Sequence, residues 1–140
     1  MDVERVLGAL NHALVLQQRS VLQFTMGAGS MFGLEYQAVG DKLWLFARAE
    51  LDDTKLLVEK ITALGGDPTL EVGQLTWKSD PGSAVDGLID AEDETIAALH
   101  EVIPHSGQEP RSEALEHLME HLIMRKQNQV DWLRRARRGP

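Results

Sequence analysis

Six polar residues interrupt the apolar stripes of this sequence, at positions where a helical pattern predicts a buried aliphatic side chain. They are Gln17, Glu50, Asp53, Glu92, Lys126 and Gln129. Glu50 and Asp53 are three residues apart, a spacing that sends both side chains off one face of a helix. Lys126 and Gln129 repeat that spacing. Burying a charge or an amide is costly unless a partner satisfies it, so we expect these side chains to meet one another.

Three kinds of chemistry suit this set. Oxygens of Glu50, Asp53 and Glu92, completed by Gln17, are donors that a hard divalent cation prefers. The ammonium group of Lys126 offers a second arrangement, in which it neutralises the same carboxylates. A third is recognition of a small anion through Lys126. We favour neutralisation, because an ammonium group repels a dication and competes with it for the same oxygens.

Four segments have the spacing of apolar residues that predicts amphipathic helices. They run from Val3 to about Met31, from Leu34 to Leu64, from Pro81 to about Ile103, and from an N-cap at Ser112 into the arginine-rich C-terminus. Residues 69–79 have no helical period and form a connection longer than most. These elements predict an all-α, antiparallel four-helix bundle with a long crossover between the second and third helices, as one domain over residues 1–140.

The polar positions fall at one height in such a bundle. Short links make the first two helices antiparallel neighbours, and likewise the last two. Gln17 and Glu50 are nearly equidistant from the first turn, and Glu92 and Lys126 are equidistant from the last one. We therefore expect a single polar layer halfway along the bundle.

Composition narrows the class of protein. A formal net charge of −8 argues against a nucleic-acid binder, and the absence of cysteine excludes thiolate metal sites and disulfides. Asp2 and Glu4 are acidic where a secretory signal needs basic residues. No apolar run is long enough for a membrane span. We expect a cytoplasmic protein.

Several stretches of the chain match a known family. They are Leu10-Asn11, Gln23-Phe24, the run from Val58 to Pro68, Thr69-Leu70 with Gly73 and Leu75, and Val130-Asp131-Trp132-Leu133. Over nearly its whole length the sequence resembles bacterioferritin and the wider ferritin-like superfamily. The resemblance implies a ferritin-like bundle.

The resemblance also implies where a di-iron centre would lie. The family's ligand positions carry Gln17, Glu50 with Asp53, Glu92, and Lys126 with Gln129. Both histidines and two of the four glutamates of the family's pattern are therefore absent. Leu51 stands where bacterioferritins have the methionine that ligates haem. The resemblance thus carries over the fold, but neither haem nor a complete ferroxidase centre.

Two further features have a structural and a functional interpretation. His117 and His121 are four residues apart among glutamates, a spacing that could bind zinc, but they project away from Lys126, which favours an outer surface or an oligomer contact. The C-terminal arginines could complement the helix dipole or bind an acidic partner. They are Arg134, Arg135, Arg137 and Arg138.

Assembly is expected as well. Ferritin-like subunits commonly pair along their first two helices, and Trp44 and Leu45 lie beside the inward stripe of the second helix. We expect at least a homodimer that buries this surface. Trp44, Trp77 and Trp132 are expected to pack at the edges of the bundle or against a second subunit. A protein partner would also suit such a surface.

The sequence therefore predicts a ferritin-like protein without a complete ferroxidase centre, which serves as a non-catalytic binding, scaffold or assembly component and needs no cofactor. The alternative is an iron-handling metalloprotein that binds, stores or oxidises iron through Glu50, Asp53 and Glu92, with a ferroxidase-type activity if it is an enzyme.

Overall fold

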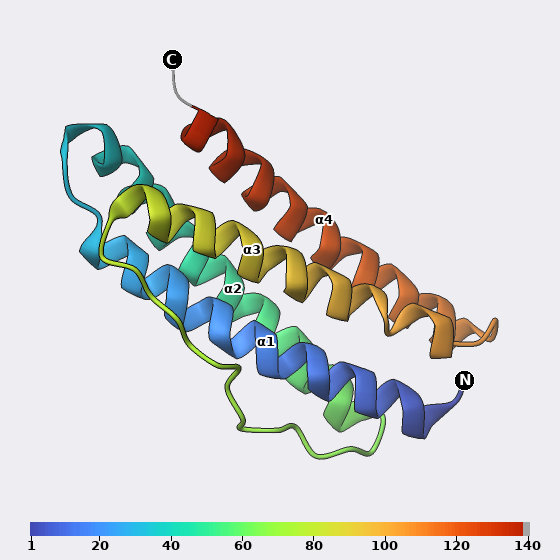
Figure 1. Cartoon of the computed structure of the whole chain (residues 1–140). Helices are drawn as coiled ribbons and strands as arrows, with labels where there is room; N and C mark the ends of the chain where they lie inside the picture. Colours follow the sequence, from blue (N-terminus) through green and yellow to red (C-terminus); the bar gives the residue numbers. More distant parts are fainter. Residues whose placement is uncertain (139–140) are drawn as a thin grey trace.

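The computed structural model describes residues 1–138, which form four long helices and, within that range, no strand. The helices are α1 (Val3–Ser30), α2 (Gln37–Ala63), α3 (Pro81–His100) and α4 (Pro110–Arg138), with short 3-10 helices η1 (Leu34–Tyr36) and η2 (Ile103–His105) between them (Figure 1). The predicted all-α four-helix bundle is confirmed.

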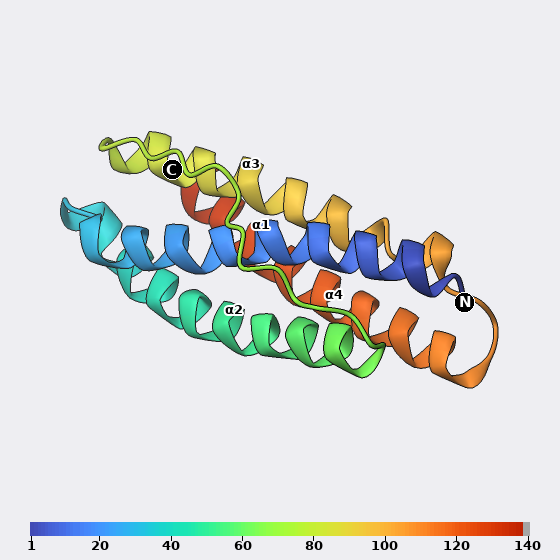
Figure 2. The ribbon, with the colours of Figure 1, turned by 90° about the horizontal axis from the view of Figure 1, so that it is seen from below.

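The connections set the directions of the helices. A short link makes α1 and α2 antiparallel, and another does the same for α3 and α4 (Figure 1). Residues 64–80 form the crossover, which runs back along the outer side of α1, so that α2 and α3 point the same way (Figure 2). This is the predicted topology.

Local sequence signals end and begin the helices. Asp80 caps α3, since its side chain accepts a hydrogen bond from the amide of Ser83 at 2.9 Å. Pro81 follows at the first helical position. Gly65 adopts a φ of +87° just past α2, a conformation that costs glycine nothing.

Two predicted boundaries need correction. The N-cap predicted at Ser112 is wrong, because α4 already begins at Pro110 and Ser112 lies in its first turn. The backbone carbonyl of Glu109 accepts from the amides of Ser112 and Glu113 at 2.9 and 3.1 Å. Proline suits the first position of a helix because its missing N–H has no partner there. The third helix also ends at His100, three residues before the predicted end; Glu101 and Val102 form a turn, and the 3-10 helix η2 begins at Ile103.

The core consists of two apolar clusters separated by a polar layer. One cluster occupies the end of the bundle with the N-terminus and includes Val6, Leu10, Leu57, Leu99 and Met119. The other occupies the opposite end and includes Phe24, Leu43, Phe46, Val85 and Leu133. On each helix the polar residues lie between the two clusters, as the sequence predicts.

Side-chain amides of α1 hold the crossover against the bundle. Asn11 donates to the carbonyl of Asp67 at 3.2 Å and accepts from the amide of Thr69 at 2.9 Å. Gln18 and Gln23 each donate to a crossover carbonyl, at 3.0 and 3.1 Å. These bonds from side chains of a fixed helix explain how a long segment without its own secondary structure keeps a defined path.

The bundle offers no candidate for a membrane span among its described helices, because none is both long and apolar enough.

Candidate functional site

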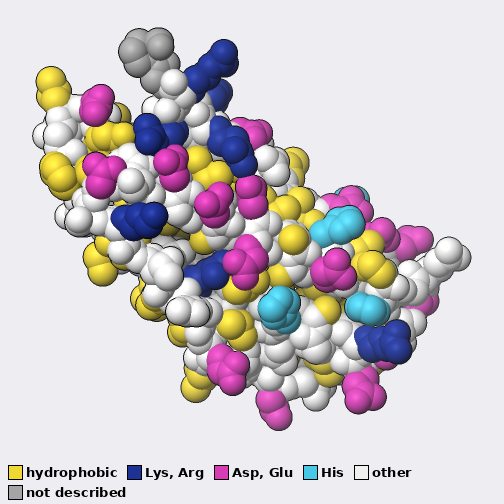
Figure 3. Space-filling model, viewed as in Figure 1, with side chains coloured by type: hydrophobic (Ala, Val, Ile, Leu, Met, Phe, Trp, Pro, Cys, Tyr) yellow, Lys and Arg dark blue, Asp and Glu magenta, His cyan; other side chains and the backbone are white. Residues whose placement is uncertain are grey.

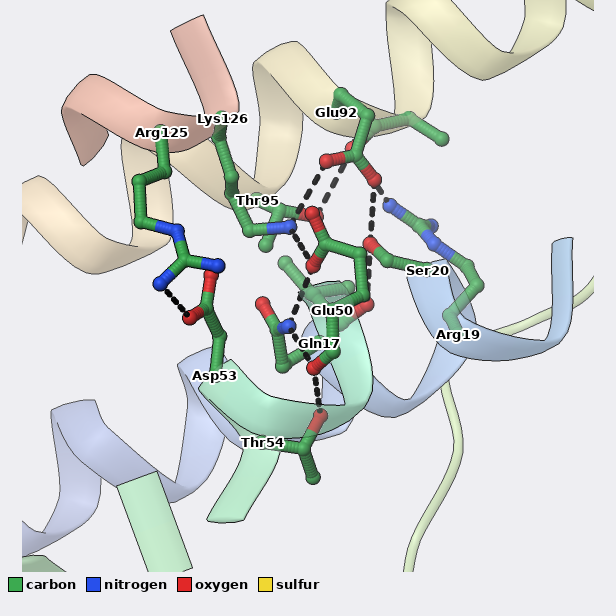
Figure 4. A network of polar contacts seen from close by, with 12 residues as sticks. Gln17, Arg19, Ser20, Glu50, Asp53, Thr54, Glu92, Thr95, Arg125 and Lys126 are labelled. Atoms are coloured by element: carbon green, nitrogen blue, oxygen red, sulfur yellow. Dashed lines mark hydrogen bonds and ion pairs between the residues drawn. The ribbon is translucent and has the colours of Figure 1, made fainter. Parts of the chain in front are cut away.

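A buried lysine forms the centre of the polar layer. The Nζ atom of Lys126 lies 2.6 Å from Glu50 Oε2 and 2.8 Å from Glu92 Oε2 (Figure 4). All three side chains are buried, and Lys126 has no exposed surface. The predicted contact between Lys126 and these carboxylates is confirmed. The three residues come from three different helices, α2, α3 and α4, so the layer ties those helices together.

Two neutral side chains from α1 complete the hydrogen bonds of the glutamates. The amide of Gln17 donates to the Glu50 carboxylate and, at 3.0 Å, to its backbone carbonyl. The Ser20 hydroxyl donates to Glu92 Oε1, the oxygen that Lys126 does not contact. Sequence reasoning missed Ser20, although it lies three residues after Gln17 and therefore on the same helix face.

Asp53 lies on the side of the layer where more hydrogen-bond acceptors lack a donor. The guanidinium of Arg125 is 3.1 Å from Asp53 Oδ1, and the arginine side chain is one-third exposed. Neither oxygen of Asp53 receives a hydrogen bond of good geometry, and the same is true of Glu50 Oε1 and Gln129 Oε1. Buried acceptors without donors are rare and costly. Sequence reasoning missed Arg125 because its neighbour in the chain, Lys126, occupies the centre of the stripe.

Burial and neighbouring charges together shift the pKa values of the ionisable side chains in this layer. Burial raises the pKa of Glu50 to about 7, although the adjacent ammonium of Lys126 opposes the shift. Burial also raises the pKa of Asp53, again against its basic neighbours. Burial alone would lower the pKa of Lys126, but the two glutamates raise it above its ordinary value. Three carboxylates face two cations, which leaves one excess negative charge when all are ionised.

The residues of this layer do not fit a di-iron centre. Lys126 fills the space between Glu50 and Glu92, and Arg125 covers Asp53. Gln17 and Gln129 present amides in place of charged or imidazole ligands. Across residues 1–138, no three or more His, Cys, Asp or Glu side chains are arranged to hold a metal ion. An anion has no access to Lys126 either, since its side chain is fully enclosed and bonded to carboxylates.

The other candidate groups lie elsewhere. His117 and His121 are exposed residues of α4. Trp44 is half-exposed, and Trp132 packs edge-on against Phe46. Two of the C-terminal arginines have specific partners on α3 that the sequence did not reveal: Arg134 contacts Asp93 at 2.8 Å, and Arg137 contacts Asp86 at 3.1 Å.

Comparison with known proteins agrees with the fold. The family model described as "Ferritin-like domain" matches residues 7–138. A crystal structure described as ferritin-like, diiron-carboxylate proteins from Bacillus anthracis strain Ames superposes with a TM-score of 0.90, covering 98% of each chain at 21% sequence identity. No curated protein has significant sequence similarity to this chain. Because the family model spans nearly all of the sequence, the chain belongs to the ferritin-like domain family.

Proposed function

We propose that this protein is a non-catalytic member of its family, related to bacterioferritin, that acts as a binding, scaffold or assembly component. In this proposal the di-iron centre is degenerate, and Lys126 supplies the positive charge that metal ions would otherwise bring to the buried carboxylates. The observation that carries the proposal is the position of the Lys126 ammonium, fully buried and hydrogen-bonded to both Glu50 and Glu92.

The energetics of the layer favour retention of the lysine. A dication entering between Glu50 and Glu92 would have to displace a cation that already makes two charge-assisted hydrogen bonds there. The displaced ammonium would remain buried without a partner, which is strongly unfavourable. The absence of haem and a cytoplasmic location stay predictions from the sequence.

Iron handling through Glu50, Asp53 and Glu92 remains the alternative function. It is favoured by the family and by the buried oxygens of Glu50 and Asp53 that lack donors. In that case iron would require Lys126 and Arg125 to move away from the carboxylates, and Gln17 would be a further oxygen ligand.

Metal content and thermal stability test the proposal. The protein is expressed in iron-rich medium, purified without chelator, and its iron is measured by mass spectrometry. Its melting temperature is then recorded with and without ferrous or cobaltous ion. We expect less than stoichiometric iron and no shift for the wild type. Two bound irons per chain, or a clear rise in melting temperature with metal, would establish the alternative.

Surface binding needs a control, because His117 and His121 are exposed and spaced to bind a divalent ion. The same measurements on a His117→Ala, His121→Ala variant remove that contribution. Metal that is lost in this variant came from the outer face of α4. Metal that persists belongs to the bundle interior and counts against the proposal.

A further inference from the structure

A groove runs along the face that α3 and α4 share. It has a volume of about 560 Å³ and lies between the C-terminal end of α3 and the N-terminal two-thirds of α4. Ile103 lines one side of it, and residues between Glu116 and Asn128 line the other. At 1.5 Å per residue these positions on α4 span roughly 18 Å, so the groove follows the helix over about three turns.

The floor of this groove is apolar. Ile103 and Ile123 line it and are partly buried against the apolar cluster at the N-terminal end of the bundle. Met124 also lines it and is 54% exposed, more than any other large apolar side chain in the described part of α3 and α4. Methionine adapts its shape to different partners and is frequent at binding surfaces. The groove therefore offers apolar surface that a partner can cover.

Two glutamates flank this floor without a cation of their own. Glu116 and Glu120 line the groove one helical turn apart on α4, so their side chains lie on one face of the helix. Within residues 1–138 neither of them forms an ion pair. The nearest arginines along α4 are Arg111 and Arg125, which contact other carboxylates at 3.5 and 3.1 Å. The groove therefore carries negative charge that is not compensated.

This charge favours an organic cation as the ligand. Acidic side chains and histidines lie around apolar surface on this face, whereas most basic side chains lie nearer the C-terminal end of α4 (Figure 3). A metal ion does not fit, because across residues 1–138 no three His, Cys, Asp or Glu side chains are arranged to hold one. Lysine and arginine combine a charged head with an apolar stem, so they match a groove with acidic walls and an apolar floor.

The length of the groove indicates the form of the ligand. A small amine would pair with the glutamates but leave most of the apolar floor in contact with water. A helix of about three turns would cover the whole floor, as amphipathic helices do in many complexes. A second copy of the chain suits the groove less well, because subunit pairing is expected along α1 and α2, on the opposite side of the bundle (Figures 1 and 2).

We propose that the groove between α3 and α4 binds a basic amphipathic helix of another protein. Lysine or arginine side chains of this partner pair with Glu116 and Glu120, and its apolar stripe covers Ile123 and Met124. The inference rests on the proposed role as a binding, scaffold or assembly component and names the chemistry of the partner. None of these four residues belongs to the polar layer.

A charge swap tests this surface. A phage-displayed library of helical peptides of about 18 residues, long enough to form a helix, keeps an apolar stripe and varies the polar positions beside it. The library is selected on the wild type and, separately, on the Glu116→Lys, Glu120→Lys variant. The wild type should enrich lysine and arginine one turn apart beside the stripe. The variant should enrich aspartate and glutamate at the same positions, because like charges across an interface are disfavoured.

The affinity of the peptide that the wild type enriches most is then measured by fluorescence anisotropy at physiological salt. Glu120→Lys should weaken its binding about tenfold or more. Met124→Ser should weaken it about fivefold, because part of the apolar contact is lost. The matched control is Glu71→Lys, the same change in charge at an exposed residue of the crossover, and it should bind the peptide as the wild type does. Circular dichroism shows whether each variant folds, and Glu120→Gln replaces Glu120→Lys if the latter does not.

Selections on the wild type that enrich no basic residues would overturn the inference. So would a peptide whose affinity does not change in the Glu120 variant. Spermidine that binds as tightly as the best peptide would show that the site takes a small amine instead. Sedimentation velocity in which the wild type self-associates and Glu120→Lys does not would assign the groove to a second copy, which also contradicts the proposal.

These outcomes are separate from those of the metal experiment. A protein that holds no iron and selects no basic helix contradicts only the assignment of the groove. A protein that selects a basic helix and binds two irons per chain contradicts only the proposed loss of the metal centre.

Discussion

The two sides of the polar layer differ in how completely their charges are satisfied. Glu92 accepts hydrogen bonds at both oxygens, one from Lys126 and one from Ser20, and all three residues are buried. Asp53 is equally buried, but the cation that contacts it, Arg125, is partly exposed, and neither oxygen receives a well-aligned hydrogen bond. The Glu92 carboxylate is hydrogen-bonded by buried side chains, whereas the Asp53 carboxylate is covered by an arginine that reaches in from the surface.

This difference shows which part of the layer cannot tolerate a change and which part can adjust by taking up a proton. Around Glu92 the donors match the acceptors, so any change leaves a charge or a hydrogen-bonding group stranded. Around Asp53, and at the Oε1 atom of Glu50, there are more acceptors than donors, so a carboxyl group can take up a proton. Substitutions on the Lys126 side should therefore cost more than equivalent substitutions on the Arg125 side.

Removing Lys126 should have the largest effect. Lys126→Met leaves Glu50 and Glu92 buried without their cation, and we expect a loss of about 3–5 kcal/mol in the free energy of unfolding at neutral pH. Urea unfolding followed by circular dichroism measures it. Lys55→Met is the control, since Lys55 is exposed and forms a surface pair with Glu59 at 3.6 Å, whose loss should cost at most about 0.5 kcal/mol. A Lys126→Met variant as stable as the control would show that the layer does not depend on its lysine.

The pH dependence of stability should show the excess negative charge. Burial raises the pKa of Glu50 from 4.5 to about 7, so the folded state binds a proton that the unfolded state releases at lower pH. The stabilisation that this proton provides is fully present below the pKa of Glu50 in the unfolded state. It is lost as pH rises through the pKa of Glu50 in the folded state. We expect the free energy of unfolding to fall between about pH 4.5 and pH 7, by at most about 3 kcal/mol from this group, because one pKa unit corresponds to about 1.4 kcal/mol. Asp53 acts in the same direction.

The test of this dependence is chemical unfolding at several pH values, with Glu50→Gln for comparison. The variant removes the titrating group while it keeps the shape of the side chain. Its stability should change less over this pH range than that of the wild type. If the wild type instead becomes more stable from pH 5 to pH 7 while the variant does not, Glu50 is already ionised and its hydrogen bonds outweigh its burial.

How much of this layer the sequence predicts depends on whether a residue breaks a pattern. Lys126, Glu50 and Glu92 were predicted to meet because each occupies an apolar stripe, and helical periodicity places such residues accurately. The four helices and the crossover were predicted for the same reason. Arg125 breaks no pattern, whereas Ser20 shares the helix face of Gln17 and was overlooked although the spacing indicates it. An arginine next to the stripe looks like any surface arginine, and only the structure shows its contact with Asp53.

The predictions of the end of the third helix and of an N-cap at Ser112 were wrong for a related reason. Both lie in the turn that joins α3 to α4, where local hydrogen bonds decide the boundary. The Glu109 side chain lies 2.9 Å from the N-terminal amino group of Met1, a contact between residues distant in sequence that no periodic pattern reveals.

If the layer is a degenerate di-iron centre, as proposed, placing the family's ligands at its positions should give metal binding. Lys126→Glu, Gln129→His, Asp53→His and Gln17→Glu together replace the central ammonium and restore carboxylate and imidazole ligands at i, i+3 spacing. The fourfold variant should be unstable without metal, because its buried carboxylates repel one another. Ferrous or cobaltous ion at about 100 times its dissociation constant should then stabilise it by about 2.7 kcal/mol, measured as a rise in melting temperature. A variant that folds yet shows no rise would contradict the assignment of these positions.

Removing Arg125 should have the smallest effect, which makes it the direct test of the difference between the two sides. Arg125→Met exposes no new charge to water but leaves Asp53 without its cation. Burial already raises the pKa of Asp53, so its carboxyl can take up a proton in response. Since the arginine is itself partly solvated, we expect a loss of about 1 kcal/mol at pH 7. Combining the change with Asp53→Asn in a double-mutant cycle isolates the pair. A loss as large as that of Lys126→Met would mean that Arg125, despite its exposure, holds the layer together as firmly as the buried lysine does.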